Sequence, residues 1–239
     1  MIRLDWETAK VAVVTIDRPE RRNAVDVQAC ADLIAATEEA VAAEARALVL
    51  QGAGGHFCAG ADLGAVEDPA FTPALQQALL AVAAAPLVVL AAIEGVCMGA
   101  GVQLAVAADL RVVTADARLA VPAGRLGLAV DTWTAARLAA AAGPGEAAAL
   151  LLAAAEIPGA RAHAIGFAQR LGSPDAARAW AVEVAALAPL TVRAHKLALS
   201  RPVGDVEAEA ARVAAWRSAD LQEGRAAFAE RRPPRFTGS

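Results

Sequence analysis

Two glycine-rich segments carry the residues whose types and spacing are best suited to chemistry. Gly99-Ala100-Gly101 and Gly60-Ala61-Asp62 place small residues where a backbone N–H group could closely approach an acyl oxygen. The stretch 99–107 also has the character of a helix start, which would put the Ala100 N–H at the positive end of a helix dipole. Two N–H groups aimed at one point form an oxyanion hole, which can stabilise an enolate by several kcal/mol. The sequence therefore predicts a backbone oxyanion hole made by Ala61 and Ala100.

Together with other motifs in the same order, these segments resemble the crotonase (enoyl-CoA hydratase/isomerase) superfamily over nearly the whole chain. The matching stretches are 11–24, 48–62, 95–104, 108–113 and 231–239. The glycine-rich segment and the run around Asp131 also resemble those of mycobacterial hydratase-like paralogues. The resemblance implies an acyl-CoA thioester as substrate or ligand, with no further cofactor and no metal.

The sequence departs from the hydratase pattern at both catalytic positions. Hydratases of this family use two glutamates, one three residues beyond the second oxyanion-hole N–H and one about twenty residues later. Counting from Ala100 places these positions at Gln103 and Ala123. Neither residue is a carboxylic acid or base, and a positioned proton-transfer group is worth about 10²–10⁴ in rate. We therefore do not expect efficient two-glutamate hydration; Gln103 could orient a water or simply be a satisfied polar helix residue.

Asp131 is the remaining acidic candidate for chemistry. It aligns with a position where relatives such as dienoyl-CoA isomerases and a halobenzoyl-CoA dehalogenase have a catalytic aspartate. Its apolar neighbours would raise its pKa toward the range of a general base. Asp131 also directly precedes a helical segment that begins at Thr132, so it could be a helix cap with a lowered pKa. Both roles are compatible with the sequence.

The resemblance also implies the ligand contacts. Residues 22–24 and 61–64 match positions where relatives hold CoA and its pantetheine arm, and Ala100 supplies the other half of the thioester clamp. Leu126 and Trp133 are candidates to line the acyl channel, and Asp62 could instead cap a short helix. The predicted substrate-binding set is Arg22, Ala24, Ala61, Asp62, Leu63, Gly64, Ala100, Leu126 and Trp133.

Three classes of function are compatible with these residues. The first is an enoyl-CoA isomerase of fatty-acid metabolism that uses the predicted oxyanion hole, with Asp131 as proton carrier. The second is a non-catalytic acyl-CoA-binding or carrier protein, because such a protein would keep the thioester clamp and lose both glutamates. The third, weaker class is a dehalogenase or thioesterase-like hydrolase with Asp131 as nucleophile, for which no partner histidine can be placed.

Composition excludes several other classes. The chain has 239 residues, 57% of them hydrophobic, and a formal net charge of −4 with both signs interspersed. An acidic chain without a basic face is not typical of nucleic-acid binding. Cys30, Cys58 and Cys97 have no paired spacing and indicate reduced thiols in the cytoplasm. The apolar stretch 78–93 is interrupted by Pro86 and is too short to span a bilayer, so membrane insertion is not expected.

Hydrophobic periodicity predicts an α/β fold. Strands are expected at 11–17, 47–51, 87–93 and 110–114, and helices at 25–43, 72–85 and 99–107. From Asp131 onward nearly everything reads as helical. This order fits the crotonase-like spiral of ββα repeats, with a core and acyl-CoA site over 1–190 and a helical region over 191–239. The resemblance implies that the helical region assembles a homotrimer, or a hexamer formed by two trimers.

Overall fold

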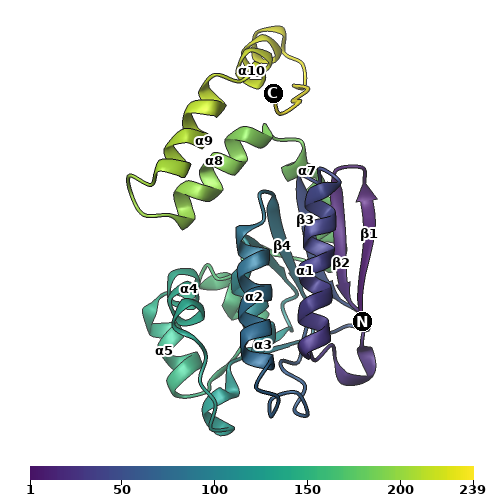
Figure 1. Cartoon of the computed structure of the whole chain (residues 1–239), viewed down its shortest axis with the longest axis vertical. Coiled ribbons are helices and arrows are strands. Elements are labelled where there is room, and N and C mark those ends of the chain that lie inside the picture. The colour runs from purple at the N-terminus through teal and green to yellow at the C-terminus, as the bar shows by residue number, and fades with distance from the viewer.

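The computed structural model describes residues 1–239 and contains two β-sheets surrounded by helices (Figure 1). The large sheet has the order β1-β2-β3-β4-β6-β9 and comprises β1 (Ile2–Thr8), β2 (Val11–Ile16), β3 (Ala47–Gly52), β4 (Val88–Ile93), β6 (Leu110–Val113) and β9 (Arg170–Leu171). The small sheet has the order β5-β7-β8 and comprises β5 (Val96–Met98), β7 (Arg118–Ala120) and β8 (Glu156–Pro158). The α-helices are α1 (Val27–Ala42), α2 (Phe71–Ala84), α3 (Ala100–Ala107), α4 (Thr132–Ala142), α5 (Pro144–Leu152), α6 (Gly159–Ala164), α7 (Pro174–Ala185), α8 (Pro189–Ser200), α9 (Val206–Trp216) and α10 (Ala219–Glu230).

In two places along the chain, consecutive strands divide between the two sheets. β4 joins the large sheet and β5 the small one, and β6 and β7 divide in the same way. Cys58, in the loop after β3, forms a parallel bridge with Cys97 of β5, so this loop extends the small sheet. The predicted α/β core followed by a helical C-terminal region is confirmed.

The central strands β2, β3 and β4 of the large sheet are buried on both faces. All six residues of β2 are buried, and they alternate between two apolar clusters: Ala12 and Val14 belong to the cluster on the α1–α2 side, while Val11 and Val13 belong to the cluster beneath α7. Figure 1 shows α1 and α2 side by side in front of the sheet. A mostly parallel sheet covered on both faces reads as continuous apolar strands, which is why β2, β3 and β4 were recognisable from sequence.

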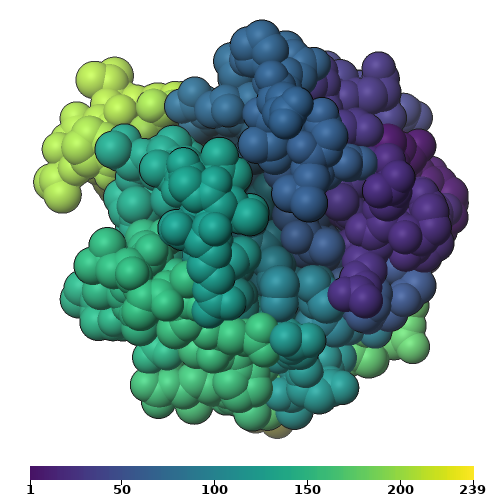
Figure 2. All heavy atoms as spheres, turned by 90° about the horizontal axis from the view of Figure 1, so that it is seen from below, coloured from purple at the N-terminus to yellow at the C-terminus, as the bar shows by residue number.

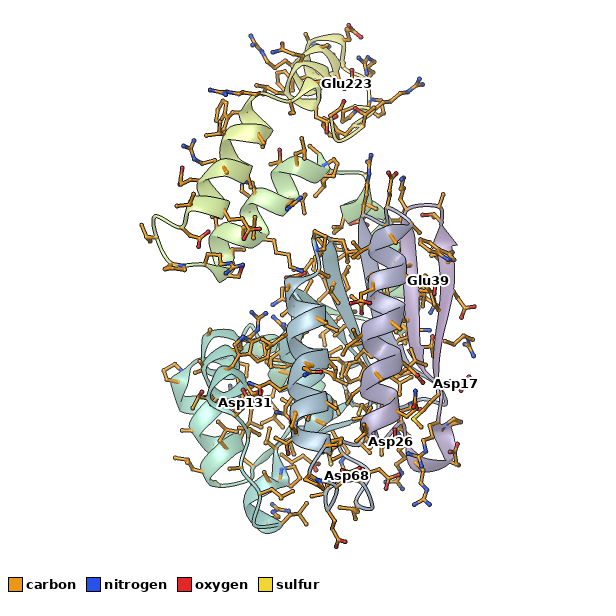
Figure 3. The ribbon with its side chains drawn as sticks, viewed as in Figure 1. Asp17, Asp26, Glu39, Asp68, Asp131 and Glu223 are labelled. Carbon is orange, nitrogen blue, oxygen red and sulfur yellow. The ribbon has the colours of Figure 1, made fainter.

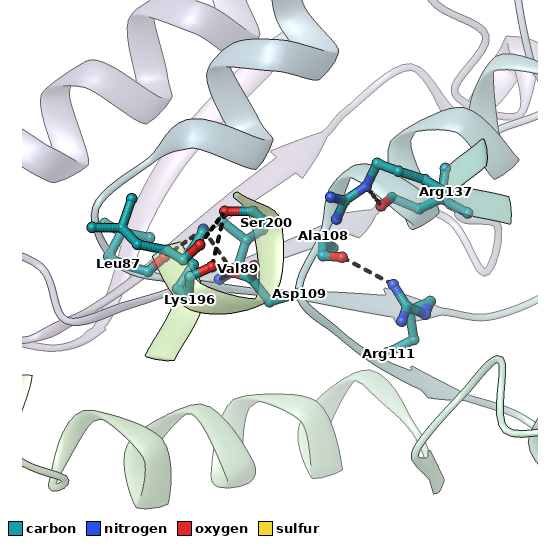
Figure 4. Close-up of polar contacts among 10 residues, drawn as sticks. Leu87, Val89, Ala108, Asp109, Arg111, Arg137, Lys196 and Ser200 are labelled. Carbon is teal, nitrogen blue, oxygen red and sulfur yellow. Dashed lines mark hydrogen bonds and ion pairs between the residues drawn. The ribbon is translucent and has the colours of Figure 1, made fainter. Parts of the chain in front are cut away.

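Helix α3 is buried along its whole length, and two arginines satisfy its C-terminal end. Arg111 donates from Nη1 to the carbonyl oxygens of Ala105 (3.1 Å) and Ala108 (2.9 Å), and Arg137 donates from Nε to Val106 O at 2.7 Å (Figure 4). Burial lowers the pKa of Arg111 to about 10, so its guanidinium remains charged at neutral pH. Cations at this end complement the helix dipole and satisfy carbonyl groups that have no intrahelical donor.

The last three helices project from the core as an arm (Figure 1). Lys196 of α8 anchors the arm: its Nζ donates to Leu87 O at 2.8 Å and lies 2.7 Å from Asp109 Oδ2, which also accepts from Val89 N–H (Figure 4). The predicted boundary at residue 190 falls in the first turn of α8. The arm is therefore joined to the core by the α7–α8 connection and by this ion pair.

The structure differs from the sequence-based elements in several places, which include the short strands β5 and β7 that were not expected. The prediction of a nearly all-helical chain after Asp131 omitted β8 and β9, which have three and two residues and are too short to show a period. The edge strand β1 was also not predicted. Asp62 caps no helix, because residues 63–67 form turns. No helix has the length and apolar character needed to cross a membrane.

Candidate active site

The two glycine-rich segments cross with their backbones in direct contact. A Cβ on Gly101 would overlap the carbonyl oxygen of Cys58, and a Cβ on Gly60 would lie 2.9 Å from Met98 O. Gly60 (φ 111°) and Gly99 (φ 53°) also have left-handed backbone conformations, which side chains rarely adopt. Only glycine therefore allows the loop after β3 to lie against the start of α3.

The N–H groups at this crossing that lack an acceptor include those of Ala61 and Ala100. The neighbouring Asp62 N–H donates to Val25 O at 2.8 Å, and Gly99 N–H donates to Ala120 O at 3.0 Å. The N–H groups of Ala61 and Ala100 donate no hydrogen bond within the protein. Ala100 is the first residue of α3, so its N–H has no intrahelical partner and lies at the positive end of the helix dipole. Both groups are available to a ligand oxygen.

Ala61 and Ala100 line one cavity of about 490 Å³, a volume in the usual range of small-molecule sites. Figure 2 views this end of the molecule, where the blue segment after residue 60 and the teal segment near residue 125 lie around the cavity. The predicted site residues that reach it are Ala24, Ala61, Asp62, Leu63, Ala100, Gln103, Leu126 and Asp131. Ala123, where the sequence analysis expected the second hydratase glutamate position, lies in its wall as well.

Three residues of the predicted substrate-binding set lie outside this cavity. Trp133 packs beneath Arg137, whose guanidinium carbon lies 5.1 Å from the centre of its ring. Gly64 closes a turn by donating its N–H to Asp62 Oδ1 at 3.1 Å. Arg22 is exposed and ends a short 3₁₀ helix, while the preceding Arg21 lines the cavity instead.

Asp62 holds the loop that carries Ala61. One carboxylate oxygen accepts the Gly64 N–H, and the other lies 2.8 Å from Arg18 Nη1. The hydrogen bond from Gly64 lowers the pKa of Asp62 against the opposing effect of burial, and the hydrogen bond and charge of Arg18 lower it further. Its carboxylate is therefore engaged in loop structure beside the cavity.

Sequence reasoning indicated that residues 66–80 set the length and shape of the acyl chain, but it left their fold open and so did not identify the apolar wall that α2 contributes. Phe71, Leu75 and Leu79 line the cavity from successive turns of this helix and are all buried. Their spacing of four residues is the signature of one helix face and could have identified the wall. The sequence does not show which side of α2 faces the glycine crossing. On its own, the four-residue spacing therefore indicates only that this face of the helix is buried in the core.

The structure places Asp131 as the N-cap of α4. Its Oδ1 accepts the Thr134 N–H at 2.9 Å, and its Oδ2 accepts the Thr134 hydroxyl at 2.7 Å. Partial burial alone would raise the pKa of Asp131, but the hydrogen bonds from Thr134 and nearby backbone outweigh it and lower the pKa below its usual value. Figure 3 marks Asp131 at the start of α4, on the side toward α2. The carboxylate is thus ionised at neutral pH and is a weak base.

Gln103 lies between the crossing and Asp131. Its Nε2 donates to Asp131 Oδ2 at 3.3 Å and to Thr134 Oγ1 at 3.1 Å, and its side chain is almost completely buried. The three side chains therefore form one hydrogen-bonded group at the cavity wall. An amide fits this position because both of its N–H donors find an oxygen acceptor.

Comparison with known proteins identifies relatives over the full length. Residues 7–239 match the enoyl-CoA hydratase/isomerase family. The chain is 42% identical to the "probable enoyl-CoA hydratase echA6" of Mycobacterium bovis, over 97% of this chain and 98% of that protein. Among solved structures, an enoyl-CoA hydratase from Mycobacterium tuberculosis has a TM-score of 0.87 and 30% identity, covering 100% of this chain and 99% of that one. An enoyl-CoA hydratase/carnithine racemase from Magnetospirillum magneticum has a TM-score of 0.89 and 32% identity, covering 100% and 96%.

A methyl group added at Gly101 tests how closely the two backbones pack at the crossing. Gly101→Ala forces the added Cβ against the Cys58 carbonyl, so we expect the free energy of unfolding to fall by about 1–3 kcal/mol. Gly145→Ala is the matched control, because Gly145 is also helical but has open space, and it should gain up to about 1 kcal/mol. Urea denaturation compares the two variants. Equal stability of both would show that the crossing has room for a side chain.

Restoring a carboxylate at position 103 should destabilise the protein. In Gln103→Glu a second carboxylate lies next to Asp131, and like charges raise the pKa of one of them. We expect a loss of about 1–3 kcal/mol at pH 7. A raised carboxyl pKa costs stability only where the unfolded chain is ionised, so the loss should shrink as the pH falls through the raised pKa and be small by about pH 4.

Urea denaturation of this variant at pH 7 and pH 4 measures the effect. Gln76→Glu, at an exposed glutamine on α2 that lines the same cavity, is the control and should change stability by less than about 0.5 kcal/mol. A loss for Gln103→Glu that is the same at both pH values would contradict the charge explanation.

Proposed function

Because this chain belongs to the enoyl-CoA hydratase/isomerase family, we propose that it binds acyl-CoA thioesters, with the thioester carbonyl oxygen held by the N–H groups of Ala61 and Ala100. The observation that carries the proposal is the pair of unpaired N–H groups on the wall of one cavity, next to a backbone crossing that only glycine permits. Donors held in place before the ligand arrives are the arrangement that stabilises a polarised carbonyl.

The remaining cavity wall offers contacts for both the acyl chain and the pantetheine arm of such a ligand. The acyl chain would lie along the apolar face of α2 formed by Phe71, Leu75 and Leu79. The pantetheine arm would leave past Ala24 and Leu63, where Arg21 offers a cation to the phosphates of CoA. Leu126 would cover the acyl chain from the opposite side. The acyl group would belong to fatty-acid metabolism, as the apolar wall favours an aliphatic chain.

The cavity supports thioester binding better than hydration. Gln103 and Ala123 occupy the two positions of the hydratase glutamates and neither can transfer a proton as a carboxylic acid. The one carboxylate beside Gln103 is Asp131, which the cap hydrogen bonds hold in its ionised, weakly basic form. An efficient general base has a pKa near the working pH, which Asp131 does not. The function we favour is therefore acyl-CoA binding or carriage without turnover.

An enoyl-CoA isomerase is the second candidate, and the position of Asp131 is the observation that favours it. Asp131 lines the same cavity as Ala61 and Ala100, so it lies within reach of a ligand bound there. In an isomerase the oxyanion hole would stabilise a thioester enolate while Asp131 carried the proton between chain carbons.

Assembly into a homotrimer, or a hexamer of two trimers, is part of the proposal. Helix α9 buries none of its residues, and Trp216 and Phe228 on the arm are 67% and 88% exposed. Exposed apolar surface of this extent is typical of subunit contacts. We place the protein in the cytoplasm, since its three cysteines are all free thiols.

Proton exchange separates the two candidates. The protein is incubated with trans-3-octenoyl-CoA in heavy water, beside Asp131→Asn, which keeps a helix cap but has no basic carboxylate, and Asp131→Ala, which lacks both. We expect saturable binding with no deuterium in the acyl chain for all three proteins. Deuterium incorporation with double-bond migration in wild type, lost in Asp131→Asn, would establish the isomerase instead. Absence of binding would contradict both candidates.

A further inference from the structure

A second cavity, of about 330 Å³, lies where the arm meets the core. The end of α2 and one face of α4 form its core side, and α8 and the start of α9 form its arm side. It shares no lining residue with the cavity that contains Ala61 and Ala100. On α2, Leu79 lines the first cavity and the exposed Leu80 lines the second. The two cavities therefore lie on different sides of this helix.

Cations dominate the lining of the second cavity, although the chain as a whole is acidic. Glu207 is the one acidic residue in the lining, and Asp109 adds a second negative charge because it pairs with Lys196 at 2.7 Å. The four cations of the lining are Arg137, Arg193, Lys196 and Arg201. Four positive charges against two negative ones leave an excess of two, which a dianion would balance.

The guanidinium groups have N–H donors that find no acceptor within the protein. Arg193 is exposed, and its side chain makes no hydrogen bond or ion pair. Arg137 donates only from Nε, to Val106 O, so both of its Nη groups remain unpaired (Figure 4). Two N–H groups of one guanidinium match two oxygens of one phosphate in spacing and direction. The cavity thus offers donor pairs from the core and from the arm.

The cations also repel one another where they are least exposed. Burial lowers the pKa of Lys196, Asp109 opposes this effect, and the positive charge of Arg137 lowers the pKa further. Burial lowers the pKa of Arg137 as well. An anion in the cavity would relieve this repulsion, and salt screens a partly buried ion pair less than an exposed one.

The rest of the wall indicates what the anion carries. Leu80, Ala83 and Leu197 are apolar, and Trp133 presents an aromatic ring to the same cavity. A volume of about 330 Å³ is in the range of small organic ligands. A phosphate monoester has a charge of about −1.5 to −2 at pH 7 and combines it with an organic group. A carboxylate has a single charge and would leave part of the excess unbalanced.

We propose that this cavity is a binding site for a small phosphate monoester, with the phosphate held by Arg137 and Arg193 and the organic group lying against Leu80 and Leu197. The site is independent of the proposed thioester binding. Because Arg137 belongs to the core and Arg193 to the arm, the bound phosphate joins these two parts of the chain.

Isothermal titration calorimetry of the full chain at constant ionic strength tests the inference with phenyl phosphate, inorganic phosphate and benzoate. We expect saturable binding of phenyl phosphate. Benzoate has the same ring with half the charge and should bind about tenfold more weakly. Inorganic phosphate should compete with phenyl phosphate but bind more weakly, because it has no group for the apolar wall.

Three variants of the chain locate the site. Arg193→Gln should weaken the binding of phenyl phosphate by about five- to tenfold, because it removes a charged donor pair. Arg217→Gln is the matched control, since Arg217 is another exposed arginine of the arm without a side-chain partner, and it lies outside the cavity. Glu207→Gln removes a negative charge from the lining and should tighten binding, which a folding defect could not do.

Several outcomes overturn the inference. Failure of wild type to bind phenyl phosphate, or equal affinities of Arg193→Gln and Arg217→Gln, removes the site. Weaker binding by Glu207→Gln contradicts the charge argument. Inorganic phosphate that binds as tightly as phenyl phosphate, or benzoate that does so, overturns the assignment of a phosphate monoester. Thioester binding is measured in the other cavity, so none of these results bears on it.

Discussion

The backbone contact between the loop after β3 and the start of α3 is the constraint on which the site depends. Cys58 O fills the space that a side chain on Gly101 would need, and the bridge from Cys58 to Cys97 fixes the same loop to the small sheet. Because two sheets and a wholly buried helix meet at this point, neither segment can move independently. The Ala61 and Ala100 N–H groups are therefore held in place by the core, as preorganised electrostatic stabilisation requires.

The opposite end of α3 contributes to the same arrangement. Arg111 and Arg137 satisfy its last carbonyl groups with permanent positive charge, so the short helix can be buried without unpaired acceptors at that end. On its cavity side, Gln103 joins α3 to Asp131 and Thr134 at the start of α4. Gln103, Asp131 and Thr134 thus form a structural link between α3 and α4.

The sequence predicted those features that depend on local sterics, and it left open those that depend on distant partners. Glycines at a close approach and continuous apolar strands identified the crossing and the central sheet. The strands β8 and β9 were too short to show a period. The role of Asp131 depends on Gln103, 28 residues away in the chain, and the position of Trp133 depends on its contact with Arg137. Neither contact leaves a pattern in the local sequence.

The ¹³C NMR spectrum of octanoyl-CoA labelled at the thioester carbonyl most directly tests the claim that backbone N–H groups hold this oxygen. Ala100→Pro is the test variant, because proline is tolerated at the first residue of a helix and has a ring carbon in place of the N–H hydrogen. The account predicts a downfield shift of the carbonyl resonance on binding to wild type and a clearly smaller shift with the variant. A resonance that does not move on binding, or that moves equally with both proteins, would contradict it.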